Sequence, residues 1–134
     1  MKNTFLVLLF TLFLQTSLQA ENNQKQIFLG QCFNSGSGVS FSFSSCVNRN
    51  FSSIASRTRG FYSYCSNIGD EVSFSFTSCI QRNFQSVERD TSGNLYLSYC
   101  FNSTRDQLGF SYISCVNRNF RAIESFINSA RGQL

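Results

Sequence analysis

The chain contains no histidine, no tryptophan and no proline, and only seven of its 134 residues are acidic. Without histidine it lacks the commonest general base and the commonest metal ligand. The acidic residues are scattered, and the one adjacent pair, Asp70 and Glu71, lies in a stretch typical of a solvated turn. The sequence also has no glycine-rich phosphate loop. We therefore predict a protein that is not an enzyme and that binds no metal and no other cofactor.

The first twenty residues, "MKNTFLVLLFTLFLQTSLQA", are typical of a secretory signal peptide. They combine one early cation, Lys2, with an uncharged apolar run at 5–14 and the small residue Ala20. The alternative is a membrane anchor, but a spanning helix needs about twenty apolar residues. We predict cleavage after Ala20, a secreted protein of residues 21–134 with a net charge of +3, and no membrane span after cleavage.

The rest of the chain contains one motif three times. "SFSFSSCVNRNFSSI" at 40–54 returns as "SFSFTSCIQRNFQSV" at 73–87 and as "GFSYISCVNRNFRAI" at 109–123. The periods are short and leave no linker between them, which is typical of a repeat protein. We predict a single domain at 21–134 built from three repeats, at about 27–60, 61–94 and 95–134.

Six cysteines in an exported chain favour disulfides, although six can pair in about fifteen ways. The repeat narrows the choice, because the two cysteines of each repeat are fourteen, fourteen and fifteen residues apart. A zinc site is the competing use, but no closely spaced cysteine pair is present. If the repeats share one structure, each closes its own bridge, and the predicted pairs are Cys32–Cys46, Cys65–Cys79 and Cys100–Cys115.

Apolar and polar residues alternate before each second cysteine, and this two-residue period predicts a strand. The predicted inward residues are Val39, Phe41 and Phe43; Val72, Phe74 and Phe76; and Leu108, Phe110 and Tyr112. A β-prone stretch also precedes each first cysteine, at 27–32, 61–65 and 95–100. Each repeat thus reads as strand, polar turn and strand, and the extra residue of the third repeat falls in the turn. We predict an all-β fold of three tandem disulfide-clasped β-hairpins.

Behind the second cysteine the apolar spacing changes to three residues, as in Phe51 and Ile54, which predicts a short helical turn. A polar triplet recurs between the cysteine and this turn. Its asparagines, Asn50, Asn83 and Asn119, are expected to cap the turn or bond to backbone. Its arginines, Arg49, Arg82 and Arg118, are candidate ligand-binding residues, because guanidinium N–H groups donate hydrogen bonds to hydroxyls and to anionic groups.

The segments "LGQCFNSGSGVSFSFSSC", "CSNIGDEVSFSFTSC" and "CFNSTRDQLGFSYISC" resemble the disulfide hairpin of cyanovirin-N homologue lectins, and "IESFINSARGQL" resembles that family's C-terminal segment. The resemblance implies a β-sheet fold, in the cyanovirin-like arrangement, that binds mannose-type oligosaccharides without a cofactor. Because the chain has three short repeats, closure with pseudo-threefold symmetry is the alternative arrangement. In that family the sugar contacts come from residues just before the first cysteine and two or three after the second. By resemblance, the carbohydrate-binding residues here are Gln31, Asn48 and Arg49; Tyr64, Gln81 and Arg82; and Tyr99, Asn117 and Arg118.

These observations predict a secreted lectin whose partners are glycans or glycoproteins. The alternative is a secreted disulfide-rich structural or protein-interaction module without a sugar site. A nucleic-acid partner is not expected, because a net charge of +3 is a weak footprint for phosphate binding. Two glycosylation sequons, Asn50-Phe-Ser and Asn102-Ser-Thr, leave open whether either asparagine carries a glycan.

Overall fold

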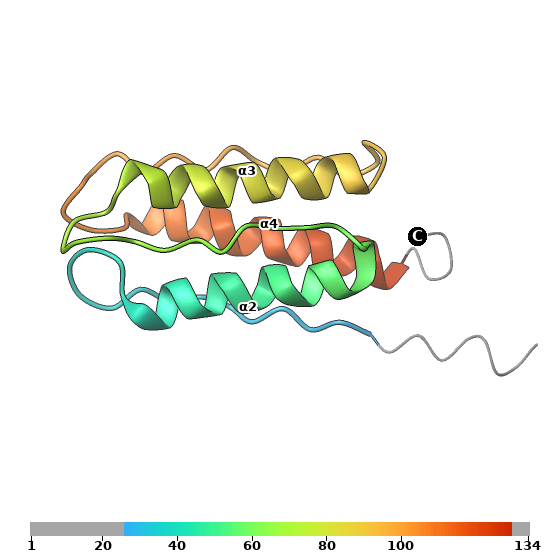
Figure 1. Cartoon of the computed structure of the whole chain (residues 1–134), viewed down its shortest axis with the longest axis horizontal. Coiled ribbons are helices and arrows are strands. Elements are labelled where there is room, and N and C mark those ends of the chain that lie inside the picture. The colour runs from blue at the N-terminus through green and yellow to red at the C-terminus, as the bar shows by residue number, and fades with distance from the viewer. Residues whose placement is uncertain (1–25, 130–134) are drawn as a thin grey trace, which may run out of the picture.

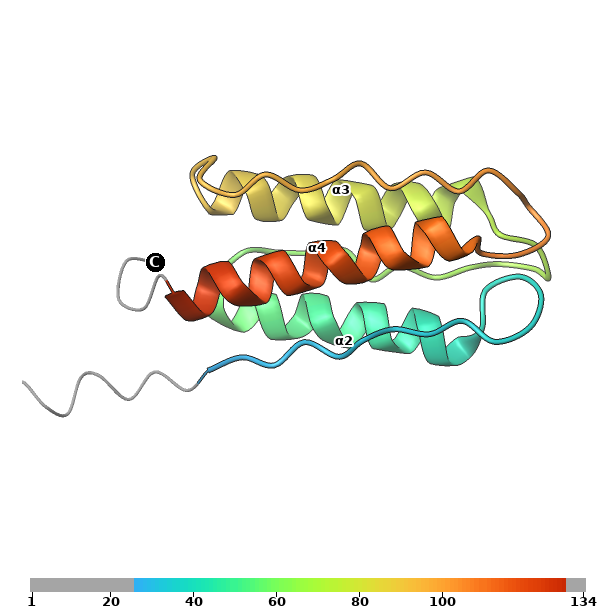
Figure 2. The same ribbon diagram turned by 180° about the vertical axis from the view of Figure 1, so that it is seen from behind.

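The computed structural model describes residues 26–129 and shows three helices, α2 (Phe41–Thr58), α3 (Phe74–Asp90) and α4 (Phe110–Ser129). All three run in the same direction, and extended segments return along the bundle between one helix and the next (Figure 1). Seen from behind, the segment before α2 still follows α2, and the segment before α4 still follows α3 (Figure 2). The predicted signal peptide at 1–20 lies outside the described residues.

The prediction of an all-β, cyanovirin-like fold of three hairpins is wrong. Within residues 26–129 the only strand-type pairing is one isolated bridge between Gly38 and Gln107. The alternation that suggested a strand covers only 39–43, and from Phe43 onward the buried residues of α2 recur every three or four positions. That longer helical period decides the local structure, because it lets one helix face be buried along its whole length. The predicted short helical turn is therefore one part of an 18-residue helix.

The serine before each phenylalanine pair begins a helix instead of alternating in a strand. Ser40 has extended backbone angles and its hydroxyl accepts the N–H of Phe43, and Ser73 does the same for Phe76. Serine is favoured at this position because its short side chain satisfies a helix N–H that has no partner in the helix. The helix places Phe43 in the core but turns the preceding aromatic outward. Phe41, Phe74 and Phe110, which were predicted to face inward, are instead 83–85% exposed.

The core is a stack of equivalent positions from the three helices. One layer consists of Phe51, Phe84 and Phe120, whose ring centroids are all 5.2 Å apart. This equal spacing shows pseudo-threefold packing around the bundle axis. Tilted and edge-to-face contacts of this kind are the preferred geometry of aromatic pairs. Further sets of equivalent, fully buried helix positions are Phe43, Phe76 and Tyr112; Val47, Ile80 and Val116; and Ile54, Val87 and Ile123.

The predicted disulfides are confirmed: Cys32–Cys46, Cys65–Cys79 and Cys100–Cys115. Each bridge joins an extended segment to the second turn of the following helix, not the two arms of a hairpin. The loop between them is organised by an asparagine two residues after the first cysteine. Its Oδ1 accepts the N–H of the residue that precedes the helix: Asn34 from Ser40, Asn67 from Ser73, and Asn102 from Gly109. This span is six residues in the first two repeats and seven in the third, so the predicted place of the extra residue is confirmed.

Candidate functional site

Side-chain amides, and not a neighbouring strand, form the hydrogen bonds to backbone N–H and carbonyl groups of the extended segments. In the first repeat, Asn50 Nδ2 donates to the carbonyl of Gly30 at 2.7 Å, and the N–H of Gly30 donates to Asn50 Oδ1 at 2.8 Å. Asn83 holds Ser63 and Asn119 holds Ser98 through the same two bonds. The expectation that these three asparagines bond to backbone is thus confirmed. Each amide lies on the helix of its own repeat, beside that repeat's disulfide.

We call such a pair of hydrogen bonds between a side-chain amide and one backbone residue a clamp. A second clamp connects each helix to the next repeat. Asn48 on α2 exchanges two hydrogen bonds with the backbone of Cys65, both at 2.8 Å. Asn117 on α4 does the same with Cys32, so the last repeat is joined to the first and the three repeats form a closed ring. Every extended segment is therefore held between two helices: its own and the preceding one.

Gln81 on α3 occupies the equivalent position in the second repeat and behaves differently. Its Oε1 accepts the N–H of Cys100 at 3.1 Å. Within the described residues, its Nε2 has no hydrogen-bond partner and the carbonyl of Cys100 accepts no hydrogen bond. The longer glutamine side chain thus makes half of the clamp that asparagine makes in the other two repeats. A free amide donor and a free carbonyl remain at this place.

Gln81 and Cys100 both line a groove of about 330 Å³ between α3 and the extended segment before α4. It combines three aromatic side chains with amides, hydroxyls and one guanidinium. Tyr99 is 70% exposed, so its ring is available on one wall. The lining residues are Phe74, Thr77, Ser78, Gln81, Arg82, Gln85, Tyr99, Cys100, Phe101 and Asn102.

The structure regroups the predicted carbohydrate-binding residues across repeat boundaries. Gln81 and Arg82 line one groove with Tyr99 of the following repeat. Asn48 contacts Cys65, the neighbour of Tyr64, and Asn117 contacts Cys32, the neighbour of Gln31. The other predicted residues, Gln31, Arg49, Tyr64 and Arg118, are exposed.

Six groove residues were not among the predicted site residues: Phe74, Thr77, Ser78, Gln85, Phe101 and Asn102. Phe74 was assigned to the core because of the supposed strand alternation. A helical reading would have placed it outside, because it comes two residues before the buried Phe76. Phe101 and Gln85 carry no sequence signal, because neither position holds the same residue type in all three repeats.

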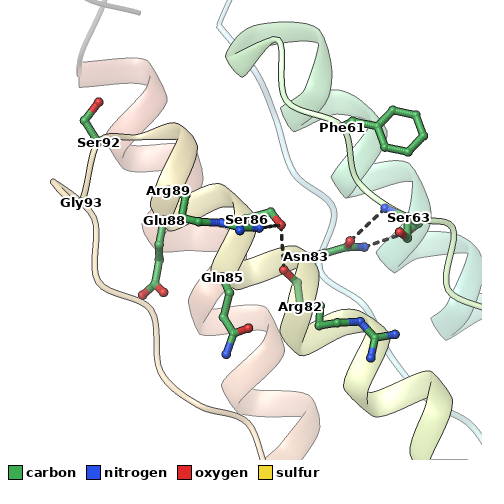
Figure 3. Close-up of a pocket in the computed structure, with 10 residues that line it drawn as sticks. All are labelled: Phe61, Ser63, Arg82, Asn83, Gln85, Ser86, Glu88, Arg89, Ser92 and Gly93. Carbon is green, nitrogen blue, oxygen red and sulfur yellow. Dashed lines mark hydrogen bonds between the residues drawn. The ribbon is translucent and has the colours of Figure 1, made fainter.

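A second hollow, wider and more open, lies along the outer face of α3 and has a volume of about 850 Å³ (Figure 3). Some of its polar groups are engaged with one another. Asn83 holds Ser63, and Arg89 donates to the hydroxyl of Ser86, which itself donates to the carbonyl of Arg82.

The described residues contain no group of histidine, cysteine and acidic side chains that could hold a metal ion. All six cysteines are bridged. Three disulfides are typical of a protein that folds in an oxidising compartment. None of the helices within residues 26–129 is both long and apolar enough to cross a membrane.

Comparisons with known protein families, with characterised proteins and with solved structures found no match for this chain.

Proposed function

We propose that this is a secreted carbohydrate-binding protein whose ligand lies in the groove between α3 and the segment before α4. The observation that carries the proposal is the composition of that groove, which sets Tyr99 and Phe101 beside the side chains of Gln81, Arg82 and Asn102. The fold implied by the lectin resemblance is absent, so the proposal depends on this groove and not on the resemblance. Secretion is supported by the disulfides and by the leader-like segment at 1–20.

The groove suits a sugar for a chemical reason. One face of a pyranose ring presents C–H groups that pack on aromatic rings, while its edge presents hydroxyls that both donate and accept hydrogen bonds. Amide and guanidinium groups supply matching donors and acceptors. Binding sites of this kind are generally concave and lined by aromatic groups with a few directed polar ones. The disulfide at Cys100 and the Asn119 clamp at Ser98 hold the aromatic wall in place before a ligand arrives.

One observation favours the second candidate, a secreted protein-interaction module. Eleven large hydrophobic side chains are exposed among the described residues, at recurring positions in the repeats. Monomeric proteins rarely leave large apolar patches uncovered. They are Phe28, Phe33, Phe41, Phe61, Tyr64, Ile68, Phe74, Tyr96, Tyr99, Phe101 and Phe110.

A glycan array probed with the oxidised protein tests the first candidate. Binding to a defined class of oligosaccharides is expected, and Tyr99→Ala and Arg82→Ala should each weaken it. Tyr96→Ala is the matched control, because Tyr96 is also an exposed tyrosine of the same segment but does not line the groove. Binding that Tyr99→Ala and Tyr96→Ala reduce equally would contradict this site. A protein that binds no glycan would favour the interaction module.

A further inference from the structure

The three clamps between neighbouring repeats differ at one side chain, and that difference leaves two groups unpaired in the third clamp. In two clamps the amide of Asn48 or Asn117 pairs with both the N–H and the carbonyl of a cysteine. In the third, Gln81 pairs only with the N–H of Cys100. Both residues line the groove, and Gln81 Nε2 and the Cys100 carbonyl are left as a donor and an acceptor.

The third clamp lacks one hydrogen bond, because Gln81 Oε1 accepts from the N–H of Cys100 while Gln81 Nε2 and the Cys100 carbonyl stay unpaired within the described residues. At Cys65 and Cys32, the position is filled by an asparagine amide that donates through its nitrogen and accepts through its oxygen. At Cys100, a ligand must accept from Gln81 and donate to the carbonyl to satisfy both groups. Burying a polar group without a hydrogen-bond partner costs about 1–3 kcal/mol of free energy. A ligand that covers both groups therefore binds more tightly if it forms a hydrogen bond with each of them.

We propose that the groove binds N-acetylated oligosaccharides and that the acetamido group is the feature it recognises. The acetamido carbonyl accepts from Gln81 Nε2, and the acetamido N–H donates to the carbonyl of Cys100. The methyl group requires an apolar wall, and Tyr99 and Phe101 flank Cys100 on either side in sequence and line the same groove. This inference rests on the proposed function, because it names the sugar class that the same groove takes.

Acetamido recognition is expected at only one of the three clamps between repeats. Asn48 and Asn117 leave no free amide atom at their clamps. The aromatic pair is also incomplete there. Ser66 stands where the third repeat has Phe101, and Gln31 stands where it has Tyr99. One binding site per chain is therefore expected.

The experiment is a calorimetric titration of the oxidised protein with two β-1,4-linked oligosaccharides of equal length, one of N-acetylglucosamine and one of glucose. We expect one site per chain and at least about tenfold weaker binding of the glucose oligomer, the ratio that corresponds to about 1.4 kcal/mol. Equal affinity for the two oligomers would overturn the acetamido inference and leave the proposed function standing. Absence of binding to either oligomer, and to a glycan array, would overturn both.

Gln81→Asn is the decisive variant, because it installs the residue that the first and third repeats carry. It should complete the clamp to Cys100 and reduce binding of the N-acetylglucosamine oligomer by about tenfold or more, since one free donor and acceptor pair is lost. Its resistance to urea should be unchanged or higher, which shows that the loss is not a loss of fold. Gln107→Asn, which makes the same side-chain change at an exposed position outside the groove, is the matched control. Undiminished binding by Gln81→Asn would overturn the inference.

Discussion

Asn117 on the last helix and Cys32 in the first extended segment are joined by two hydrogen bonds, of 2.7 and 2.8 Å, although 85 residues separate them in the chain. This pair closes the ring of repeats. Asn117 is only 5% exposed, so neither of its bonds is readily replaced by water. Two further groups of α4 hold the same segment, Glu124 at Leu29 and Asn128 at Ile27.

Asn117→Ala should lower the free energy of unfolding by about 1–3 kcal/mol, because it leaves the buried N–H and carbonyl of Cys32 without partners. Urea denaturation of the oxidised protein measures this change. Arg118→Ala, at the exposed neighbouring position, is the control and should stay within about 0.5 kcal/mol of the parent. If both variants unfold at the same urea concentration, the ring closure does not contribute to stability.

The aromatic triad predicts a strong difference between two phenylalanines of α3. Phe84→Ala should lower the free energy of unfolding by about 3–5 kcal/mol, because Phe84 is fully buried and packs on both Phe51 and Phe120. Phe74→Ala should change it by less than about 1 kcal/mol, because Phe74 is exposed. Thermal or urea unfolding of the two variants compares them directly. Equal losses would contradict the helical register.

Tyr112 is expected to be more stable as phenylalanine. It is 1% exposed, and its hydroxyl has no hydrogen-bond partner among the described residues. The equivalent positions of the other repeats are Phe43 and Phe76. Tyr112→Phe should therefore raise the free energy of unfolding by about 1 kcal/mol, the cost of leaving a buried hydroxyl unpaired. Tyr62→Phe is the contrasting variant and should lower it, because the Tyr62 hydroxyl bonds to both Thr58 and Asp90.

Stability should fall in strong alkali. Burial raises the pKa of Tyr112, and burial together with the bond to Asp90 raises the pKa of Tyr62. The folded protein keeps both protons at a pH at which the unfolded chain, with a tyrosine pKa of about 10, has released them. The stabilisation is fully present below pH 10 and is lost progressively above it. Urea midpoints measured from pH 8 to 11 should decline at the upper end, and Tyr112→Phe should make the decline shallower.

The Asn50 sequon should carry no glycan in the folded protein. Asn50 is 4% exposed, and its amide nitrogen donates to the carbonyl of Gly30, so a sugar at that nitrogen is incompatible with the clamp. In a host that glycosylates secreted chains, Ser52→Ala removes the sequon at an exposed position and should raise the yield of folded protein. The same variant should have no effect in a host without N-glycosylation. A folded, fully bridged protein with a glycan on Asn50 would contradict the clamp.

Local periodicity misled the fold prediction for a definable reason. The five residues from Val39 to Phe43 alternate like a strand, whereas the helical spacing begins at Phe43 and extends over the rest of α2. The extended stretches before the first cysteines are real, but they pair with asparagine side chains and not with another strand. An amide side chain can supply the same donor and acceptor as a neighbouring strand, and a short sequence pattern does not distinguish the two.

The sequence by itself determined the three repeats, the three disulfides and the backbone role of Asn50 and its two equivalents. These features are decided within one repeat, so copying the repeat copies them. Only the tertiary structure decided which repeats meet. It joined Gln81 and Arg82 to Tyr99 of the next repeat and Asn117 to Cys32 at the far end of the chain. The physical reason is that the helices are parallel, so that each returning segment lies between two helices and takes its second set of partners from a different repeat.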